Sequence, residues 1–285
     1  MSATPRNAIT VDVEDYYHAA ALGSAYPRSA WDELPSRVED ATRRILDLFA
    51  AGGATGTFFI LGSVARAHPA LVRAIAEAGH EVASHGDRHY RVTEQTPEVF
   101  ARDIRAAKAA VEDASGQAVQ GYRAANFSID RSTWWAFETL AAEGFRYSSS
   151  VNPIRHDHYG VPDAPRAPFE PLPGFLEIPI TTATLAGRRL PAGGGGYFRL
   201  LPYALFRFAL GRVSRGEGLP LNFYFHPWEV DPGQPRADVG GRSRFRHYVN
   251  LDRMEGKLRR LLADFPWSRM DAVYAGELAA ARSRA

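Results

Sequence analysis

The sequence predicts a single α/β domain, a distorted (β/α) barrel of about seven or eight strand–helix units. Short β-rich runs alternate with helix-like segments along most of the chain. The 285 residues, 45% of them hydrophobic, suit one barrel with a large core. Polar side chains follow the ends of several expected strands, which is the edge where such barrels place their active sites.

The first half alternates regularly between the two patterns. A β-rich run at Ala8–Val13 precedes Ser36–Glu39, which has the form of a capping box and predicts a helix that ends at Gly52 and Gly53. Thr55–Leu61 is nearly all apolar, as expected of a strand buried on both faces. The further elements expected are helices from Pro69 to Gly79, Pro97 to Ala114 and Ser132 to Glu143, and strands at His80–Ser84, Val119–Arg123 and Phe145–Ser148.

The second half begins with a proline-rich excursion. Six prolines between residues 152 and 174 disfavour helix there. The alternation then resumes, so we expect residues 1–150 to form the core and residues 151–285 to complete the barrel. The four glycines at 193–196 lack the Lys-Ser/Thr of a phosphate-binding loop and predict a turn or a close backbone approach. The elements expected here are strands at Leu176–Ile180, Leu221–His226 and Ser268–Val273, helices at Tyr203–Val213 and Leu251–Phe265, and a terminal helix.

Composition excludes several classes of function. The chain has no cysteine, which rules out disulfides, thiolate metal sites and cysteine nucleophiles. A net charge of +2 gives no indication of nucleic-acid binding. The polar start of the chain lacks the apolar core of a signal peptide, and no apolar run approaches the roughly 18 residues of a membrane span. We therefore expect a cytoplasmic protein without a transmembrane segment.

Two histidines at positions i and i+4, His85 and His89, directly follow a strand-like run. If they share one turn of helix, they lie on one face and can bind one metal ion together. A carboxylate as third ligand would complete an open, catalytic zinc-type site. An ordinary structural pair is the alternative, because nine histidines in a chain of this length often give such spacing by chance.

Other chemistry-bearing residues follow other expected strands. Asp12–Asp15 lies at the end of the first strand, Arg123 ends the fourth, and His226 follows the strand near residue 221. Because the carboxyl ends of parallel barrel strands meet on one rim, acid, imidazole and guanidinium groups converge there. This combination is typical of a metal-dependent hydrolase.

Four ordered motifs carry a family resemblance: TVDVED at residues 10–15, SHxxxH at 84–89, YRAxxFS at 122–128 and YFHPWE at 224–229. The set resembles the NodB-type polysaccharide deacetylases, carbohydrate esterase family 4. The segments GGGYFRLLP (194–202) and SRFRHYVNLDR (243–253) narrow the resemblance to the subgroup associated with bacterial exopolysaccharide and exosortase (PEP-CTERM) loci. The resemblance covers almost the whole chain and implies a NodB-type barrel with a C-terminal family-specific extension.

The resemblance implies a hydrolase that removes acetyl groups from N-acetylhexosamine units with the help of one divalent metal ion. Zn²⁺ is the expected ion, with Co²⁺ and Ni²⁺ as alternatives. Asp12 matches the general base, Arg123 the residue that holds that carboxylate, and His226 the general acid. His85 and His89 match the metal-binding imidazoles. The implied partner is an N-acetylated glycan, an exopolysaccharide or its cytoplasmic precursor, lipid- or nucleotide-linked.

Two acidic residues compete for the place of the third metal ligand. The common family motif has adjacent carboxylates, whereas here Val13 separates Asp12 from Glu14. In an extended strand Asp12 and Glu14 project to the same face, which favours Glu14. If the chain turns sharply at Glu14, Asp15 takes that place instead.

Two positions depart from the family pattern. Ala125 stands where the third motif usually has proline, and Ser148 stands where the fifth strand usually has an aspartate that orients or tunes the general acid. Without that aspartate, we expect His226 to have a lower pKa and a less fixed ring. Three other carboxylates are candidates to replace it: Asp157, Asp163 and Glu229.

Aromatic residues flank the motifs, and Trp228 and Tyr197 either stack on sugar rings or pack in the core. Two other functions stay open on the sequence alone. One is a metal-independent amidase that acts on a small molecule, and the other is a catalytically weak glycan-binding protein with the same barrel. The complete set of histidines and acids favours the metal-dependent deacetylase.

Overall fold

The computed structural model describes residues 7–156, 159–185 and 187–284. Its main sheet has the strand order β10-β1-β2-β3-β4-β5-β7-β6, and β11 pairs with the start of β1. Neighbouring strands are parallel except β6 and β7. The strands of this sheet are β1 (Asn7–Val13), β2 (Thr57–Ile60), β3 (Glu81–Ser84), β4 (Gly121–Tyr122), β5 (Tyr147–Ser148), β6 (Phe169–Leu172), β7 (Phe175–Glu177), β10 (Asn222–Phe225) and β11 (Trp267–Ser268).

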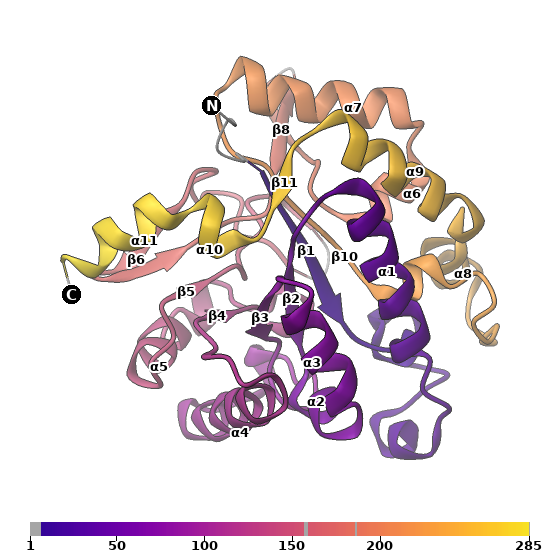
Figure 1. The fold of residues 1–285 in the computed structure, drawn as a ribbon, viewed down its shortest axis with the longest axis horizontal. Helices are drawn as coiled ribbons and strands as arrows, with labels where there is room; N and C mark the ends of the chain where they lie inside the picture. The colour runs from indigo at the N-terminus through magenta and orange to yellow at the C-terminus, as the bar shows by residue number, and fades with distance from the viewer. Residues whose placement is uncertain (1–6, 157–158, 186, 285) are drawn as a thin grey trace.

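Helices surround the sheet, with α1 to α5 along its outside (Figure 1). A small antiparallel hairpin of β8 (Thr182–Leu185) and β9 (Arg188–Pro191) stands apart from the main sheet. No helix in the described ranges is long and apolar enough to cross a membrane. The helices are α1 (Val38–Gly52), α2 (Gly62–Ala67), α3 (Pro69–Glu77), α4 (Pro97–Ser115), α5 (Ala136–Ala142), α6 (Gly195–Leu200), α7 (Tyr203–Gly211), α8 (Gly241–Tyr248), α9 (Leu251–Asp264), α10 (Met270–Val273) and α11 (Ala275–Arg282).

The predicted mixed α/β fold with a curled, barrel-like sheet is confirmed, and its closure is irregular. Asn222, at the start of β10, donates through its side chain to the carbonyls of Ile178 (3.2 Å) and Pro179 (3.0 Å). Its own carbonyl accepts the N–H of Thr181 at 3.2 Å. The segment 178–181, which follows β7, therefore bonds to β10 through these single contacts, where a regular barrel would have two paired strands.

Helix α1 shows how the sequence pattern becomes packing. Its buried face lies in one core with the apolar residues of β1 and β2. The helix ends at Gly53, whose φ of 62° is easily adopted by glycine. The predicted capping box is wrong, because Ser36 donates to the carboxylate of Asp15 at 2.6 Å instead of capping the helix.

Two other expected elements differ from the structure. The strand predicted at Ser268–Val273 is mostly helical, since only Trp267 and Ser268 pair with β1 and α10 begins at Met270. The helix predicted from Ser132 begins later, at Ala136, because Asp130 caps a separate 3₁₀ turn at Arg131–Thr133. The first error concerns the type of element, because a helix replaces most of the expected strand, and the second is a boundary shift that a local cap contact causes.

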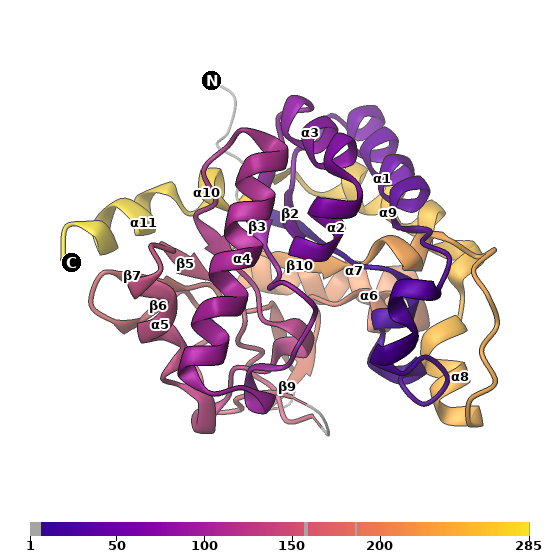
Figure 2. The same cartoon turned by 90° about the horizontal axis from the view of Figure 1, so that it is seen from below.

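The segment that follows β1 leaves the sheet and packs on a distant part of the chain. Short 3₁₀ turns occupy Tyr16–His18 and Ala20–Leu22, and the second of these lies against α8 (Figure 2). Its aromatic and aliphatic side chains form a small cluster with Trp228 and Leu251. The carboxyl end of β1 is therefore covered by residues from both ends of the sequence.

Glu177 on β7 is fully buried, and burial raises the pKa of its carboxyl from 4.5 to about 7. Because the folded protein then holds this proton more tightly than the unfolded chain, stability from this group is present below about pH 4.5 and is lost as the pH rises through 7. Glutamine keeps the acceptor for the N–H groups of Ser150 and Val151. As the pH rises from 5 to 8, we expect the unfolding free energy of Glu177→Gln to increase by about 1–3 kcal/mol relative to that of the parent.

Urea unfolding at several pH values measures this difference. Glu255→Gln, at an exposed ion pair with Arg259 on α9, is the control and should show no such trend. A difference for Glu177→Gln that stays constant across this pH range would contradict the expectation.

Candidate active site and metal centre

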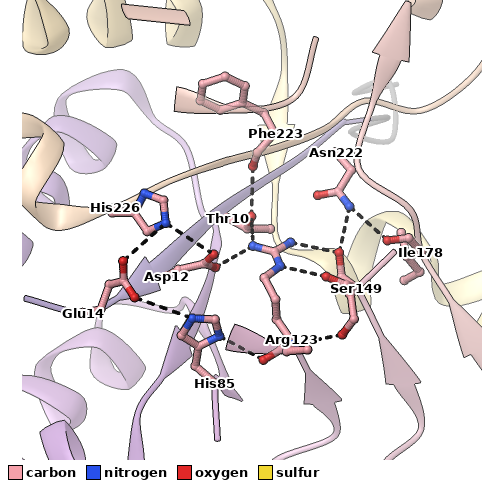
Figure 3. Close-up of polar contacts among 12 residues, drawn as sticks. Thr10, Asp12, Glu14, His85, Arg123, Ser149, Ile178, Asn222, Phe223 and His226 are labelled. Carbon is pink, nitrogen blue, oxygen red and sulfur yellow. Dashed lines mark hydrogen bonds and ion pairs between the residues drawn. The ribbon is translucent and has the colours of Figure 1, made fainter. Parts of the chain in front are cut away.

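Arg123, directly after β4, is the buried centre of the site (Figure 3). One terminal nitrogen donates to Asp12 Oδ1 at 2.6 Å and to Thr10 Oγ1 at 2.7 Å. Its other nitrogens donate to the backbone carbonyl and the hydroxyl of Ser149, each at 2.9 Å. The guanidinium carbon lies 4.1 Å from the centre of the Phe59 ring. A buried cation is stable only when paired in this way, so Arg123 fixes the ends of β1, β4 and β5 relative to one another.

Glu14, His85 and His89 come together beside Asp12, with one ligand atom of each within 4.8 Å of the others. All three side chains are buried. Glu14 Oε2 lies 2.7 Å from Nε2 of His89 and 3.9 Å from Nε2 of His85. It has no hydrogen-bond partner of good geometry among the described residues. A buried acceptor that faces two imidazole nitrogens is the arrangement that a divalent cation would complete.

The backbone of the site determines which nitrogen of His85 faces Glu14. Nδ1 of His85 lies 2.9 Å from the carbonyl oxygen of Arg123, which can only accept a hydrogen bond. The proton therefore resides on Nδ1, and Nε2 presents its lone pair toward Glu14. Burial is the main cause that lowers the pKa of His85 to about 4, and the nearby His89 adds to it. The ring is therefore neutral and can bind a cation.

The two histidines do not share a helical turn, so that expectation is wrong. They lie in an irregular loop after β3, in which Gly86 has a φ of 79° and His89 a φ of 56°. Arg28 donates to the carbonyls of Arg88 and His89, each at 2.8 Å, and so holds the loop from outside. The same convergence of imidazoles is reached by loop geometry instead of helical spacing.

The structure brings Glu14 to the histidines and holds Asp15 elsewhere. Asp15 accepts the hydroxyl of Ser36 at 2.6 Å and the backbone N–H of Arg37 at 2.8 Å. Burial opposes ionisation of Glu14, but the adjacent histidines outweigh it and hold the pKa of its carboxyl well below the ordinary range. Glu14 is therefore the carboxylate available to a cation in this pocket.

His226 follows β10 and faces the same pocket. Its Nε2 lies 3.6 Å from Glu14 Oε1 and 3.9 Å from Asp12 Oδ2, and its Nδ1 lies 2.9 Å from Glu229 Oε1. Burial alone would lower the pKa of His226, but Glu14 and Glu229 outweigh it and raise the pKa to about 9. The expected lowering of this pKa is therefore wrong.

Glu229 is the candidate carboxylate that contacts His226 in the structure. Asp163 pairs with Arg131 on the exposed surface, and Asp157 lies outside the described residues. Ser148 is buried and shares a 2.7 Å hydrogen bond with Ser150, so it makes a local contact on β5. The departure at position 148 thus coincides with a carboxylate supplied by the His226 segment itself.

The two aromatic candidates have different surroundings. Trp228 is buried, donates to Glu14 Oε1 at 3.2 Å, and stacks between the rings of His226 and His247. It packs behind the site instead of offering a free face to a sugar. Tyr197 on α6 is 37% exposed and does not line the described pocket around Glu14.

A cavity of about 140 Å³ lies over the site, and a neighbouring cleft of about 500 Å³ shares His89 and Asn126 with it. Asn126 and Phe127 have φ values of 54° and 51°, so this turn after β4 holds a strained backbone at the cavity wall. The cavity is lined by Asp12, Glu14, His85, His89, Asn126, Phe127, Tyr159, Tyr224 and His226.

Sequence reasoning missed His18, a wall residue of the neighbouring cleft. Its Nδ1 accepts the N–H of Asp15 at 2.9 Å, so its Nε2 carries the proton. Burial, followed by His89, lowers the pKa of His18 to about 3, and the ring is neutral. The spacing DYYH after the first motif was the available signal, but its meaning depends on the 3₁₀ turn at Tyr16–His18.

Comparison with known proteins agrees with this geometry. Residues 29–145 match the family model described as polysaccharide deacetylase, and residues 149–275 match a domain of unknown function, DUF3473. Residues 29–145 therefore contain a polysaccharide deacetylase domain of the NodB type, carbohydrate esterase family 4. The DUF3473 match fits the subgroup that the sequence motifs resemble.

Curated relatives align with only part of the chain. A chitooligosaccharide deacetylase of Rhizobium leguminosarum bv. trifolii is 40% identical over 83 residues, which are 29% of this chain and 39% of that protein. The peptidoglycan-N-acetylglucosamine deacetylase PgdA of Listeria monocytogenes is 34% identical over 86 residues, which are 30% of this chain and 18% of that protein. The aligned region thus spans well under half of either relative.

Solved structures support the fold over nearly the whole chain. A Mycobacterium smegmatis protein assigned to the polysaccharide deacetylases has a TM-score of 0.63 at 17% identity, covering 99% of this chain and 92% of its own. The peptidoglycan deacetylase PdaC of Bacillus subtilis has a TM-score of 0.50 at 12% identity, covering 99% and 94%. At these identities the likeness concerns the fold alone.

We expect the purified protein to bind about one divalent ion per chain after zinc loading. His89→Ala and Glu14→Gln should lose that ion, because each removes one of the three converging ligand atoms. Elemental analysis after desalting measures the stoichiometry, and circular dichroism checks that the variants are folded.

Asp15→Asn is the matched control, since Asp15 is a buried neighbour of Glu14 that makes its contacts outside the cluster. It should keep the ion. Loss of the ion in Asp15→Asn with retention in Glu14→Gln would assign the third ligand to Asp15 instead.

Proposed function

We propose that this chain is a metal-dependent deacetylase that hydrolyses the N-acetyl amide of N-acetylhexosamine units. The observation that carries the proposal is the convergence of Asp12, His226 and the cluster Glu14, His85 and His89 on one cavity. The resemblance of the motifs and the names of the curated relatives support the same reaction. In this reading residues 1–150 form the deacetylase core, and residues 151–285 complete the barrel and supply the general acid.

Glu14, His85 and His89 would hold the ion, and one carboxylate with two imidazoles suits Zn²⁺ first and Co²⁺ or Ni²⁺ next. When bound, a divalent ion supplies Lewis-acid polarisation of the amide carbonyl and increases the acidity of water. The ligand atoms are pre-positioned by the chain itself, because His85 is fixed by the Arg123 carbonyl and Glu14 by Trp228.

Asp12 is the proposed general base. Arg123 occupies its Oδ1, so its Oδ2 remains directed toward His226, 3.9 Å away, and toward the cavity. In hydrolysis, water adds to the amide carbon and gives a proton to Asp12. The C–N bond then breaks as His226 donates its Nε2 proton to the leaving nitrogen, which yields acetate and a free amine on the sugar.

We propose an exopolysaccharide, or its lipid- or nucleotide-linked precursor, as the glycan that carries the acetyl group. The match of the second half to DUF3473 and the motif subgroup support this choice. The cleft beside the cavity has walls of Tyr17, Tyr26 and Trp31 along with polar groups, a composition suited to sugar rings.

The test is acetate release from an N-acetylchitooligosaccharide by zinc-loaded protein. We expect His226→Ala and Asp12→Asn each to lower kcat by about 10²- to 10⁴-fold, since each loses a proton-transfer group. His226→Ala should retain the ion. Asp163→Asn, at a surface pair with Arg131, should keep the parent activity.

Chelation separates the alternatives. Acetate release that survives complete removal of metal would support a metal-independent amidase. Saccharide binding without acetate release at saturating metal would support a glycan-binding protein. Full activity of His226→Ala would overturn the assigned mechanism.

A further inference from the structure

The general acid proposed above is held at its other nitrogen by Glu229. Glu229 Oε1 lies 2.9 Å from Nδ1 of His226 and also accepts the backbone N–H of His226 at 3.1 Å. Because a carboxylate can only accept, Nδ1 carries a proton and Nε2 is the nitrogen presented to the cavity. Glu229 lies in the 3₁₀ turn Pro227–Val230 and is fully buried.

Arg199 on α6 holds Glu229 in turn. Its Nε donates to Glu229 Oε2 at 2.7 Å, and the guanidinium is almost wholly buried. Its terminal nitrogens donate to the backbone carbonyls of Arg246, His247 and Val249 at 2.7–3.2 Å. Nearly all of its donor capacity is used, so the guanidinium has one position and Glu229 is fixed against it.

The other two carboxylates near His226 have different partners. Asp12 is bound by Arg123, and Glu14 faces His85 and His89. Both lie on the Nε2 side of the His226 ring, whereas Glu229 lies on the Nδ1 side. Ser148 offers no carboxylate from β5. Glu229 is therefore the carboxylate that can orient the ring without contacting Nε2, the nitrogen that faces the cavity.

The glycine run supplies space for this contact. A Cβ on Gly195 would lie 2.2 Å from Glu229 Oε1, whereas a Cβ on Gly196 would meet no atom within 4 Å. Gly195 thus lets α6 approach the carboxylate closely enough for Arg199, one turn further on, to reach it. This contact explains one glycine of the run, Gly195, without a phosphate-binding role.

We propose that Arg199 and Glu229 are positioning residues that fix the ring orientation of His226 and keep a proton on its Nδ1, and that the DUF3473 half adds this positioning to the reaction along with His226 itself. The segments GGGYFR and SRFRHYV converge on this pair, the first through Arg199 and the second through the carbonyls that Arg199 binds. The inference rests on the proposed function, in which His226 is the general acid.

The experiment compares Glu229→Gln and Gly195→Ala with the parent, all zinc-loaded, on N-acetylchitopentaose. Glu229→Gln should lower kcat by about 10- to 100-fold with KM little changed, because the orienting charge acts on proton transfer. Gly195→Ala keeps every charged group and displaces the carboxylate, so it should lower kcat in the same way. Metal content should equal that of the parent in both variants.

Two matched controls separate positioning from loss of stability. Gly196→Ala makes the same change one residue away without a clash and should keep kcat within about two-fold. Asp231→Asn breaks the ion pair between Asp231 and Arg37, which lies beside the Pro227–Val230 turn and does not contact His226. This variant should lower Tm and leave kcat unchanged. Equal losses of kcat in these controls would overturn the proposal.

Long-range ¹H–¹⁵N NMR of ¹⁵N-histidine protein provides a readout that needs no activity. The parent should show a proton on Nδ1 of His226, identified by its absence in His226→Ala, and Glu229→Gln and Gly195→Ala should change that tautomer or protonation pattern. An unchanged pattern in both would overturn the proposal. If the parent releases no acetate, the proposed function fails on this substrate, while the NMR result still decides the positioning role.

Discussion

The buried guanidinium of Arg123 is the interaction on which the site depends. It binds the proposed base through Asp12, the first strand through Thr10 and the end of β5 through Ser149. Its backbone carbonyl also fixes the tautomer of His85. A cation without solvent must satisfy its donors internally, so the positions of these groups are set together. One residue thus links the proposed acid–base groups of the pocket to the proposed cation ligands, and a substitution there would disturb both.

Much of the site could be read from the sequence because its residues follow strands. Strand alternation favoured Glu14 over Asp15 as the third proposed ligand, and in the structure Ser36 and Arg37 of a distant loop bind Asp15. The helical turn expected for His85 and His89 failed because a loop with Gly86 at positive φ reaches the same convergence. The link from Arg199 to Glu229 had no local pattern, since it exists only once α6 packs against the turn after β10.

The proposed site residues are distributed unequally between the two halves of the chain. The region that matches the deacetylase model contains His85, His89 and Arg123. Asp12 and Glu14 precede it, and His226 lies within the DUF3473 match. Both matched regions, along with the first strand, therefore contribute to one cavity, and the sheet joins them because β10 from the second half pairs with β1. This shared sheet makes the halves a structural unit around the site.

The pairing of β1 with β10 also has a consequence for how the protein is made. Thr10 bonds to Phe223, 213 residues later in the chain. Contacts of such high sequence separation form slowly because a long loop must close first. During synthesis from the N-terminus, the three proposed cation ligands emerge well before the imidazole opposite them, His226. Until then β1 has an unpaired edge, and a nascent chain in this state is exposed to mispairing with other strands.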